Sequence, residues 1–212
     1  MNALPVMFHL AGRRCVIAGG GAVARRRAAA LLDAGAEVLV VAPDVCDELA
    51  AMPIRIERRA YQADDLTGAL LVVIATDDGN LNRQIAGDAR DRGVLVNQAD
   101  DPEASDITMT AHQQHGCVTI AVHTGGASAS AAVAICRELS DALDADWPIL
   151  LERVIPWRRS IQEQITDAKA RQAALRQLTS ADAMTTLKQH GQAAFDRYCQ
   201  QVLDRHRTAS AT

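Results

Sequence analysis

The sequence predicts an α/β fold, in which a parallel sheet is followed by a small strand–strand–helix block and a helical C-terminal domain. Two observations predict it. Short apolar runs alternate with helical segments through residues 14–97, and strands that alternate with helices form parallel sheets through right-handed crossovers. The pattern then changes to two alternating segments, one helix and a helical tail. We therefore expect three domains, at residues 1–106, 107–146 and 147–212.

A glycine-rich turn follows the first apolar run. Strand, glycine turn, helix and second strand lie within about thirty residues, which is the βαβ unit of a Rossmann-type sheet that binds a dinucleotide. Gly19 allows the tight turn, Gly21 lets the backbone approach a pyrophosphate, and Ala24 lets the helix pack closely on the strand. The N–H groups at the helix start then face the phosphates. The alternative is a strand–helix turn without a ligand.

The other elements are predicted from hydrophobic periodicity and turn residues. In the sheet region we expect an edge segment at residues 4–10, helices at 44–51 and 81–92, and strands at 54–57, 70–76 and 94–97. After the sheet region we expect a hairpin of residues 107–111 and 117–124, joined by HQQHG. A helix follows, with Ser128 and Ser130 as candidate caps. From residue 148 we expect further helices, whose apolar face is interrupted at Pro156. The 107–146 block is too small to bury a core alone, so we expect it to pack on a second copy of the chain.

Composition limits the classes of function. A net charge of −4 and an aromatic content of 3% argue against general nucleic-acid binding. Five scattered cysteines without a CxxC pair predict neither a disulfide framework nor a cysteine zinc site. No apolar run approaches the roughly 20 residues of a membrane helix. The N-terminal segment does not resemble a signal peptide, and we expect a cytoplasmic protein without membrane contact.

Ligands of open parallel sheets bind beyond the carboxyl ends of the strands. Polar side chains follow two of those ends. Thr76 lies on the dinucleotide side, while Asp77 or Asp78 is equally explained as a helix cap. Asp100 and Asp101 follow the last strand of the sheet, where a carboxylate can take a proton from a substrate as a hydride leaves to a nicotinamide. The alternative for this acidic pair is a polar turn.

Three further groups are candidates for binding. The turn His123-Thr124-Gly125-Gly126 offers backbone N–H groups to an anion, or is simply a strand-to-helix turn. Arg25, Arg26 and Arg27 place positive charge at a helix start, where acids are favoured; this favours an anionic ligand at Arg26 and Arg27, and the alternative is that one or two of the three are simply solvated. His112 and His115 are three residues apart, but with no third ligand a solvated turn is favoured, so we predict no metal site.

Taken together, these motifs resemble a known family. GGGAVARRRAAALLDAGAEVLVVAPD, ATDD, NQADDPEASD and AVHTGGASAS, in this order and spacing, are similar to the N-terminal module of siroheme synthases. That family comprises precorrin-2 dehydrogenases, some of which are also sirohydrochlorin ferrochelatases. The resemblance implies oxidation of precorrin-2 to sirohydrochlorin with NAD, a homodimer and, in bifunctional members, insertion of ferrous iron as a substrate.

The resemblance also implies roles for individual residues. Asp100 matches the catalytic aspartate of the family, a general base. Thr124 matches a position near the tetrapyrrole, beside Gly125 and His123, and the eight carboxylates of the substrate explain Arg26 and Arg27. The NAD contacts are expected at Gly19, Gly21, Ala22, Val23, Pro43, Asp44 and Thr76.

Several positions depart from the family pattern, namely Ile107, Thr110, His123 and Ala129. They leave the dehydrogenase interpretation intact and weaken the expectation of iron insertion. Two other functions remain to be weighed. A non-catalytic NAD-sensing module keeps the glycine turn but has no need of Asp100, and a dehydrogenase of another small substrate is disfavoured only weakly.

Overall fold

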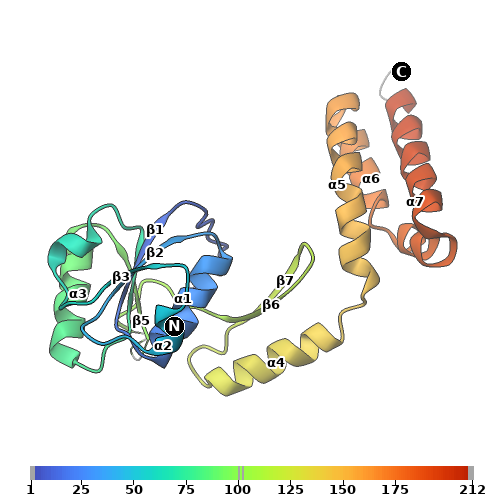
Figure 1. The fold of residues 1–212 in the computed structure, drawn as a ribbon. Coiled ribbons are helices and arrows are strands. Elements are labelled where there is room, and N and C mark those ends of the chain that lie inside the picture. The colour runs from blue at the N-terminus through green and yellow to red at the C-terminus, as the bar shows by residue number, and fades with distance from the viewer. Residues whose placement is uncertain (1–2, 100, 102, 210–212) are drawn as a thin grey trace. The chain divides into compact units, whose positions relative to one another are not determined.

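The computed structural model describes residues 3–99, 101 and 103–209. The chain forms two compact units, which divide between Met109 and Thr110. The first holds the parallel sheet, and the second holds a hairpin and the C-terminal helices (Figure 1). The division into three domains at residues 1–106, 107–146 and 147–212 remains a proposal.

The first unit is built on five parallel strands in the order β3-β2-β1-β4-β5. This is the order of a Rossmann-type sheet, and the predicted fold class is confirmed. The strands are β1 (Arg14–Ala18), β2 (Glu37–Val41), β3 (Arg55–Glu57), β4 (Leu71–Ile74) and β5 (Leu95–Gln98).

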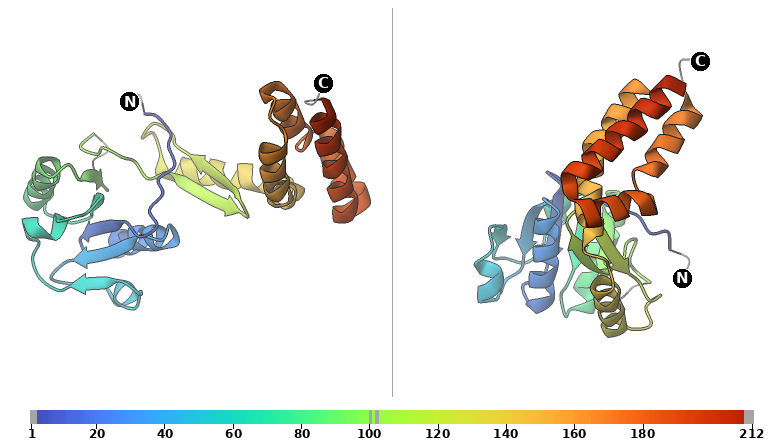
Figure 2. Two further views of the ribbon diagram at one scale, coloured as in Figure 1. Left: turned by 90° about the horizontal axis from the view of Figure 1, so that it is seen from above. Right: turned by 90° about the vertical axis from the view of Figure 1, so that its right-hand side faces the viewer.

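Helices cover both faces of this sheet (Figures 1 and 2). On β1, Cys15 and Ile17 pack in one core with α1 and α2, whereas Val16 and Ala18 pack in a second core with α3. Strands buried on both faces need apolar residues at every position, which explains the continuous apolar runs of the sequence. The helical elements are α1 (Ala22–Asp33), α2 (Asp47–Ala50), the 3₁₀ helix η1 (Ala63–Leu66) and α3 (Gly79–Asp91).

Two predictions for this unit need correction. The segment at residues 4–10, expected along the edge of the sheet, is exposed irregular chain, of which only Leu10 is buried. The helix expected at residues 44–51 is only the short α2, because β2 leads into the irregular residues 42–46 before the helix begins. Residue 46 is hydrogen-bonded to the glycine turn, which holds this stretch away from helical geometry.

The second unit begins with an antiparallel hairpin of β6 (Ala111–His115) and β7 (Val118–Val122), followed by α4 (Ala129–Asp141). The predicted strand boundaries were wrong, because the HQQH residues lie within β6 and the turn is only Gly116 and Cys117. Gly116 has φ +55°, as a two-residue hairpin turn requires. Polar residues are tolerated in β6 because they are largely exposed.

The C-terminal helices are α5 (Asp146–Gln164), α6 (Ala168–Gln177) and α7 (Ala181–Ala209), which enclose a core around Phe195, Leu150 and Ile161. Helix α5 continues through Pro156. Helix α7 consists of two helical segments that meet at Gly191, whose φ is +75°. Across residues 3–99, 101 and 103–209, no helix has the length and apolar character needed to span a membrane.

Candidate dinucleotide site

The glycine turn after β1 is held tightly between the ends of β2 and β4. Gly19 has φ +128°, and a β-carbon there would lie 2.2 Å from the carbonyl oxygen of Ala75. A β-carbon on Gly20 would lie 1.9 Å from the carbonyl oxygen of Asp44. Neither position can carry a side chain without displacing neighbouring backbone, so both glycines are required by packing.

Gly20 is the position that sequence reasoning missed. The dinucleotide fingerprint assigns roles to the first and third glycines of the turn, and leaves the second undefined. In the structure, the carbonyl of Gly20 accepts a hydrogen bond of 2.9 Å from the backbone N–H of Cys46, and the Gly19 N–H donates to Val41 at 3.1 Å. The signal in the sequence was that the middle position of the turn is also glycine, although the fingerprint does not require it there.

Gly21 differs from its two neighbours. It precedes α1 as its N-cap residue, and nothing lies within 4 Å of a β-carbon built on it. It has no capping side chain, and the first turn of α1 contains no acidic residue. The N–H groups of this turn are therefore presented by an open backbone, which is the arrangement that binds a phosphate. Ala22 and Val23 form the start of the same turn.

The ends of β2 and β4 flank the glycine turn. Pro43 and Asp44 are exposed just beyond β2. The Thr76 hydroxyl lies 2.5 Å from Asn82 Oδ1, and the Asn82 amide donates to the Thr76 carbonyl at 3.1 Å. Asp78 caps α3 by accepting from the N–H groups of Asn80 and Leu81, so the helix-cap alternative holds for Asp78. The internal hydrogen bonds of Thr76 fix this strand end in place.

The chain after β5 folds back on the strand. Asn97 is buried and donates to the carbonyl of Ile107 at 2.9 Å, and the Ser105 hydroxyl accepts from the Gln98 N–H at 2.8 Å. Asp101 Oδ1 accepts from the N–H groups of Glu103 and Ala104, at 3.0 and 3.1 Å. Asp101 therefore forms the polar turn. Asp100, the candidate general base, lies outside the described residues.

In the second unit, the candidate substrate residues follow β7. Thr124 Oγ1 donates to the carbonyl of Ser128 at 3.0 Å and accepts from its N–H at 3.3 Å. Gly125 and Gly126 have φ of +65° and +85°, which glycine adopts without strain. Ser128 caps α4 by accepting from the Ala131 N–H. These contacts account for a strand-to-helix turn, and His123 is exposed beside it.

The two histidines of β6 do not form a pair. His112 and His115 are three residues apart on one strand, so their side chains project to opposite faces. Within the described part of the chain, no group of three or more His, Cys, Asp and Glu side chains is placed to hold a metal ion.

Comparison with known proteins now decides the family. Residues 6–111 match a family described as putative NAD(P)-binding. The chain belongs to this NAD(P)-binding family. It is 36% identical over 175 residues to a siroheme synthase from Chromobacterium violaceum and 33% identical over 175 residues to one from Nitrosococcus oceani. Both alignments cover 81% of this chain and 37% of the relative, so the chain spans little more than a third of their length.

A solved structure gives an independent comparison. The structure named "SirC, precorrin-2 dehydrogenase" matches with a TM-score of 0.74 and 25% identity, over 94% of this chain and 100% of that chain. The resemblance to siroheme synthases inferred from the sequence motifs is thereby confirmed. In this NAD(P)-binding chain, the glycine turn and the start of α1 fit the pyrophosphate of a nicotinamide dinucleotide.

The arginines of α1 lie in the first two turns of the helix that follows the glycine turn. Arg26 is exposed and Arg27 is half-buried. Burial, together with the adjacent charge of Arg26, holds the pKa of the Arg27 guanidinium below its usual value. A nearby anion would stabilise both charges, and the anionic ligand expected from the sequence stays a prediction.

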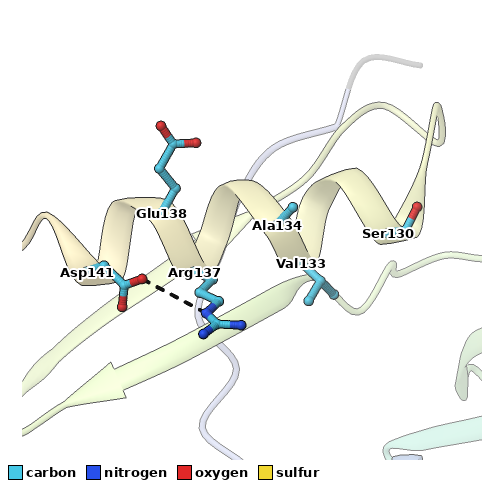
Figure 3. A pocket seen from close by; sticks show the side chains of 6 residues that line it. All are labelled: Ser130, Val133, Ala134, Arg137, Glu138 and Asp141. Carbon is cyan, nitrogen blue, oxygen red and sulfur yellow. Dashed lines mark ion pairs between the residues drawn. The ribbon is translucent and has the colours of Figure 1, made fainter.

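One surface of the NAD(P)-binding chain is notable outside the first unit. Figure 3 shows an open hollow along α4, lined by residues of that one helix, with Arg137 paired to Asp141 at 3.9 Å. Large apolar side chains are exposed on the same helix: Val133, Ile135 and Leu139 are 60%, 41% and 50% exposed. Of these, Ile135 and Leu139 are four residues apart and therefore lie next to each other on the helix surface.

Proposed function

We propose that the chain is an NAD-dependent dehydrogenase that oxidises precorrin-2 to sirohydrochlorin in siroheme biosynthesis. The observation that carries the proposal is the glycine turn. Gly19 and Gly20 are fixed by backbone contacts, while Gly21 is open at the start of α1. This geometry occurs in a chain similar to siroheme synthases and to a precorrin-2 dehydrogenase.

The residues of the first unit suit the cofactor. The N–H groups around Gly21, Ala22 and Val23 would hold the pyrophosphate, and Pro43 and Asp44 would contact the adenosine ribose. A carboxylate beyond β2 accepts a hydrogen bond from a ribose 2′-OH and repels a 2′-phosphate, so we assign NAD rather than NADP. Bound there, NAD supplies a hydride acceptor.

We assign Asp100 as the general base. Oxidation of precorrin-2 removes a hydride and a proton, and a carboxylate beyond the end of β5 is suited to accept the proton. Asp101 is committed to the turn through two backbone N–H groups, which makes it the less suitable of the two adjacent acids.

We assign substrate contacts to Arg26, Arg27, His123, Thr124 and Gly125. The arginines offer positive charge to the carboxylates of a tetrapyrrole. The exposed turn after β7 offers backbone N–H groups, and the Thr124 hydroxyl holds that turn in shape. We further propose a homodimer formed through the exposed apolar residues of α4.

The test is to supply purified protein with precorrin-2 and NAD and to follow the absorption of NADH and sirohydrochlorin. We expect both to appear in equal amounts with the wild-type chain. Asp100→Asn should abolish their formation and leave the affinity for NAD within about threefold, because an amide accepts no proton at neutral pH.

Asp101→Asn is the matched control, because its amide oxygen still accepts from the N–H groups of Glu103 and Ala104, and its kcat should stay near the wild-type value. Normal turnover by Asp100→Asn would remove the base assignment. NAD binding without any tetrapyrrole oxidation would instead favour an NAD-sensing module. Addition of ferrous iron at the end of the reaction tests chelation in the same sample, through the spectrum of siroheme.

A further inference from the structure

A hollow lies in the first unit between α3 and the chain that follows β5. It has a volume of about 590 Å³, and its lining includes Asn82, Arg83, Ala86 and Arg90 of α3 together with Gln98 and Asp101. The helical residues recur at intervals of three and four, so they form one stripe along α3. The hollow begins beside Gln98 at the carboxyl end of β5, the side of the sheet on which ligands bind, and extends along α3 to Arg90 near the end of that helix.

The two arginines of the hollow have few protein partners. Arg83 donates to Asn80 Oδ1 at 2.5 Å, and Arg90 approaches the carbonyl of Ala104 at 3.5 Å. Within the described part of the chain neither guanidinium forms an ion pair with a carboxylate, although Arg92, the C-cap residue of α3, pairs with Asp64. A guanidinium has five N–H donors, so most of them are available to an anion.

The acid in the lining does not cancel this charge. Asp101 directs Oδ1 to the N–H groups of Glu103 and Ala104, so its carboxylate is engaged by the turn. Gln98 adds an amide whose N–H groups suit the same kind of ligand. The described residues of the lining therefore offer two cations and an amide donor against one carboxylate that is engaged by the turn, which is the chemistry of an anion site.

The position of the hollow separates it from the phosphates of the dinucleotide. In the strand order, the glycine turn follows β1 at the centre, whereas β5 is the edge strand on the side away from β2. Arg83 and Arg90 are two helical turns apart, about 10 Å along the axis. That spacing suits two acidic arms of one larger ligand better than a single small anion.

We propose that Arg83 and Arg90 bind carboxylate arms of the tetrapyrrole and set the specificity of the enzyme for a polycarboxylate. This inference rests on the proposed function, since it assigns a further part of the substrate-binding surface. The two arginines hold the substrate and take no part in proton or hydride transfer. Their loss therefore weakens binding more than turnover.

The experiment compares Arg83→Gln, Arg90→Gln and the double variant with wild type. Arg92→Gln is the control, because Arg92 caps the end of the same helix but lies outside the lining of the hollow. Sirohydrochlorin affinity is measured by titration, together with NAD affinity and the kcat and KM for precorrin-2. Each single variant should weaken sirohydrochlorin binding and raise KM about tenfold, the size of one lost charge-assisted hydrogen bond.

The same variants should leave kcat and NAD affinity within about twofold of wild type. A double variant that binds sirohydrochlorin as wild type does, while the wild type is active, overturns this inference and spares the proposed function. A parallel titration with inorganic phosphate tests whether the two arginines bind a phosphate group instead of the carboxylates of the tetrapyrrole. If phosphate binding is lost in the double variant and sirohydrochlorin binding is not, the hollow is a phosphate site. A wild-type chain that neither oxidises precorrin-2 nor binds sirohydrochlorin overturns both.

Discussion

The backbone of Gly20 lies so close to that of Asp44 that a β-carbon on residue 20 would stand 1.9 Å from the Asp44 carbonyl oxygen. This contact joins the glycine turn, to which we assign the pyrophosphate, to the segment after β2, to which we assign the ribose. Gly20→Ala must separate the two segments, so we expect a loss of about 2 kcal/mol in the free energy of unfolding, as for an overpacked core. Chemical denaturation and NAD titration should both register the change.

Gly21 gives the matched comparison. Its φ is −89° and a β-carbon there meets no atom within 4 Å, so Gly21→Ala should fold with wild-type stability. Gly21→Asp should also fold, but its carboxylate would face the pyrophosphate and remove NAD binding. Unchanged NAD affinity in Gly21→Asp would contradict the site, and wild-type stability in Gly20→Ala would contradict the packing argument.

The Rossmann-type core could be predicted because its signal is local and repeated. A strand buried on both faces must be apolar throughout, and a tight turn before a helix requires glycine. The requirement at Gly20 could not be predicted, because it arises from Asp44 and Val45, which approach only after folding. The dinucleotide fingerprint that GGGAVARRR matches describes the residues needed for ligand binding. It does not include the residues that packing within the protein requires.

The hairpin was misplaced for a different reason. HQQH lacks the alternation of a half-buried strand, and the sequence therefore favoured a loop. In the structure His112, Gln113 and Gln114 are exposed, so β6 needs little apolar character, and the left-handed φ of Gly116 fixes the turn. Sequence patterns detect strands that are buried on one face, and β6 has no fully buried residue. Thr124 shows a related limit, because its hydrogen bonds to Ser128 explain the turn whether or not a substrate binds.

The Asp65–Arg59 pair predicts how stability depends on pH. Asp65 is buried, accepts from the Arg59 guanidinium at 2.6 and 2.9 Å, and also accepts from the Gln62 N–H. The hydrogen bonds from Arg59 hold the pKa of Asp65 below its usual value. The ionised Asp65 carboxylate therefore contributes fully to the free energy of unfolding above its unfolded-state pKa of about 4. This contribution is lost as the pH falls through the lower folded-state pKa.

We expect Asp65→Asn to cost about 2 kcal/mol at neutral pH, a figure reduced for the partial exposure of Arg59. The difference from wild type should shrink when urea unfolding is repeated below pH of about 4. Asp64→Asn is the neighbouring control: its side chain is 96% exposed and its pairing with Arg92 is long, at 3.8 Å. A cost for Asp65→Asn that persists unchanged at low pH would contradict the assignment.

Cysteine reactivity should follow burial. Burial raises the pKa of the Cys15 thiol to about 11 and that of Cys199 to about 12, so neither forms appreciable thiolate near neutral pH. Cys117 is exposed in the hairpin turn. Alkylation of the native protein should therefore modify Cys117 before either buried thiol, as mass spectrometry of timed samples can establish. Cys117→Ser should remove the earliest adduct; early labelling of Cys15 would mean that the first core opens readily.

The exposed apolar residues of α4 predict self-association. Ile135 and Leu139 are four residues apart and therefore adjacent on the helix, and they are 41% and 50% exposed. A charge at either position leaves the buried Cys136 untouched but opposes burial against a second copy of the chain. Leu139→Glu should shift sedimentation from dimer towards monomer, while Glu138→Gln should not. If Leu139→Glu sediments as wild type does, α4 is not the dimer surface.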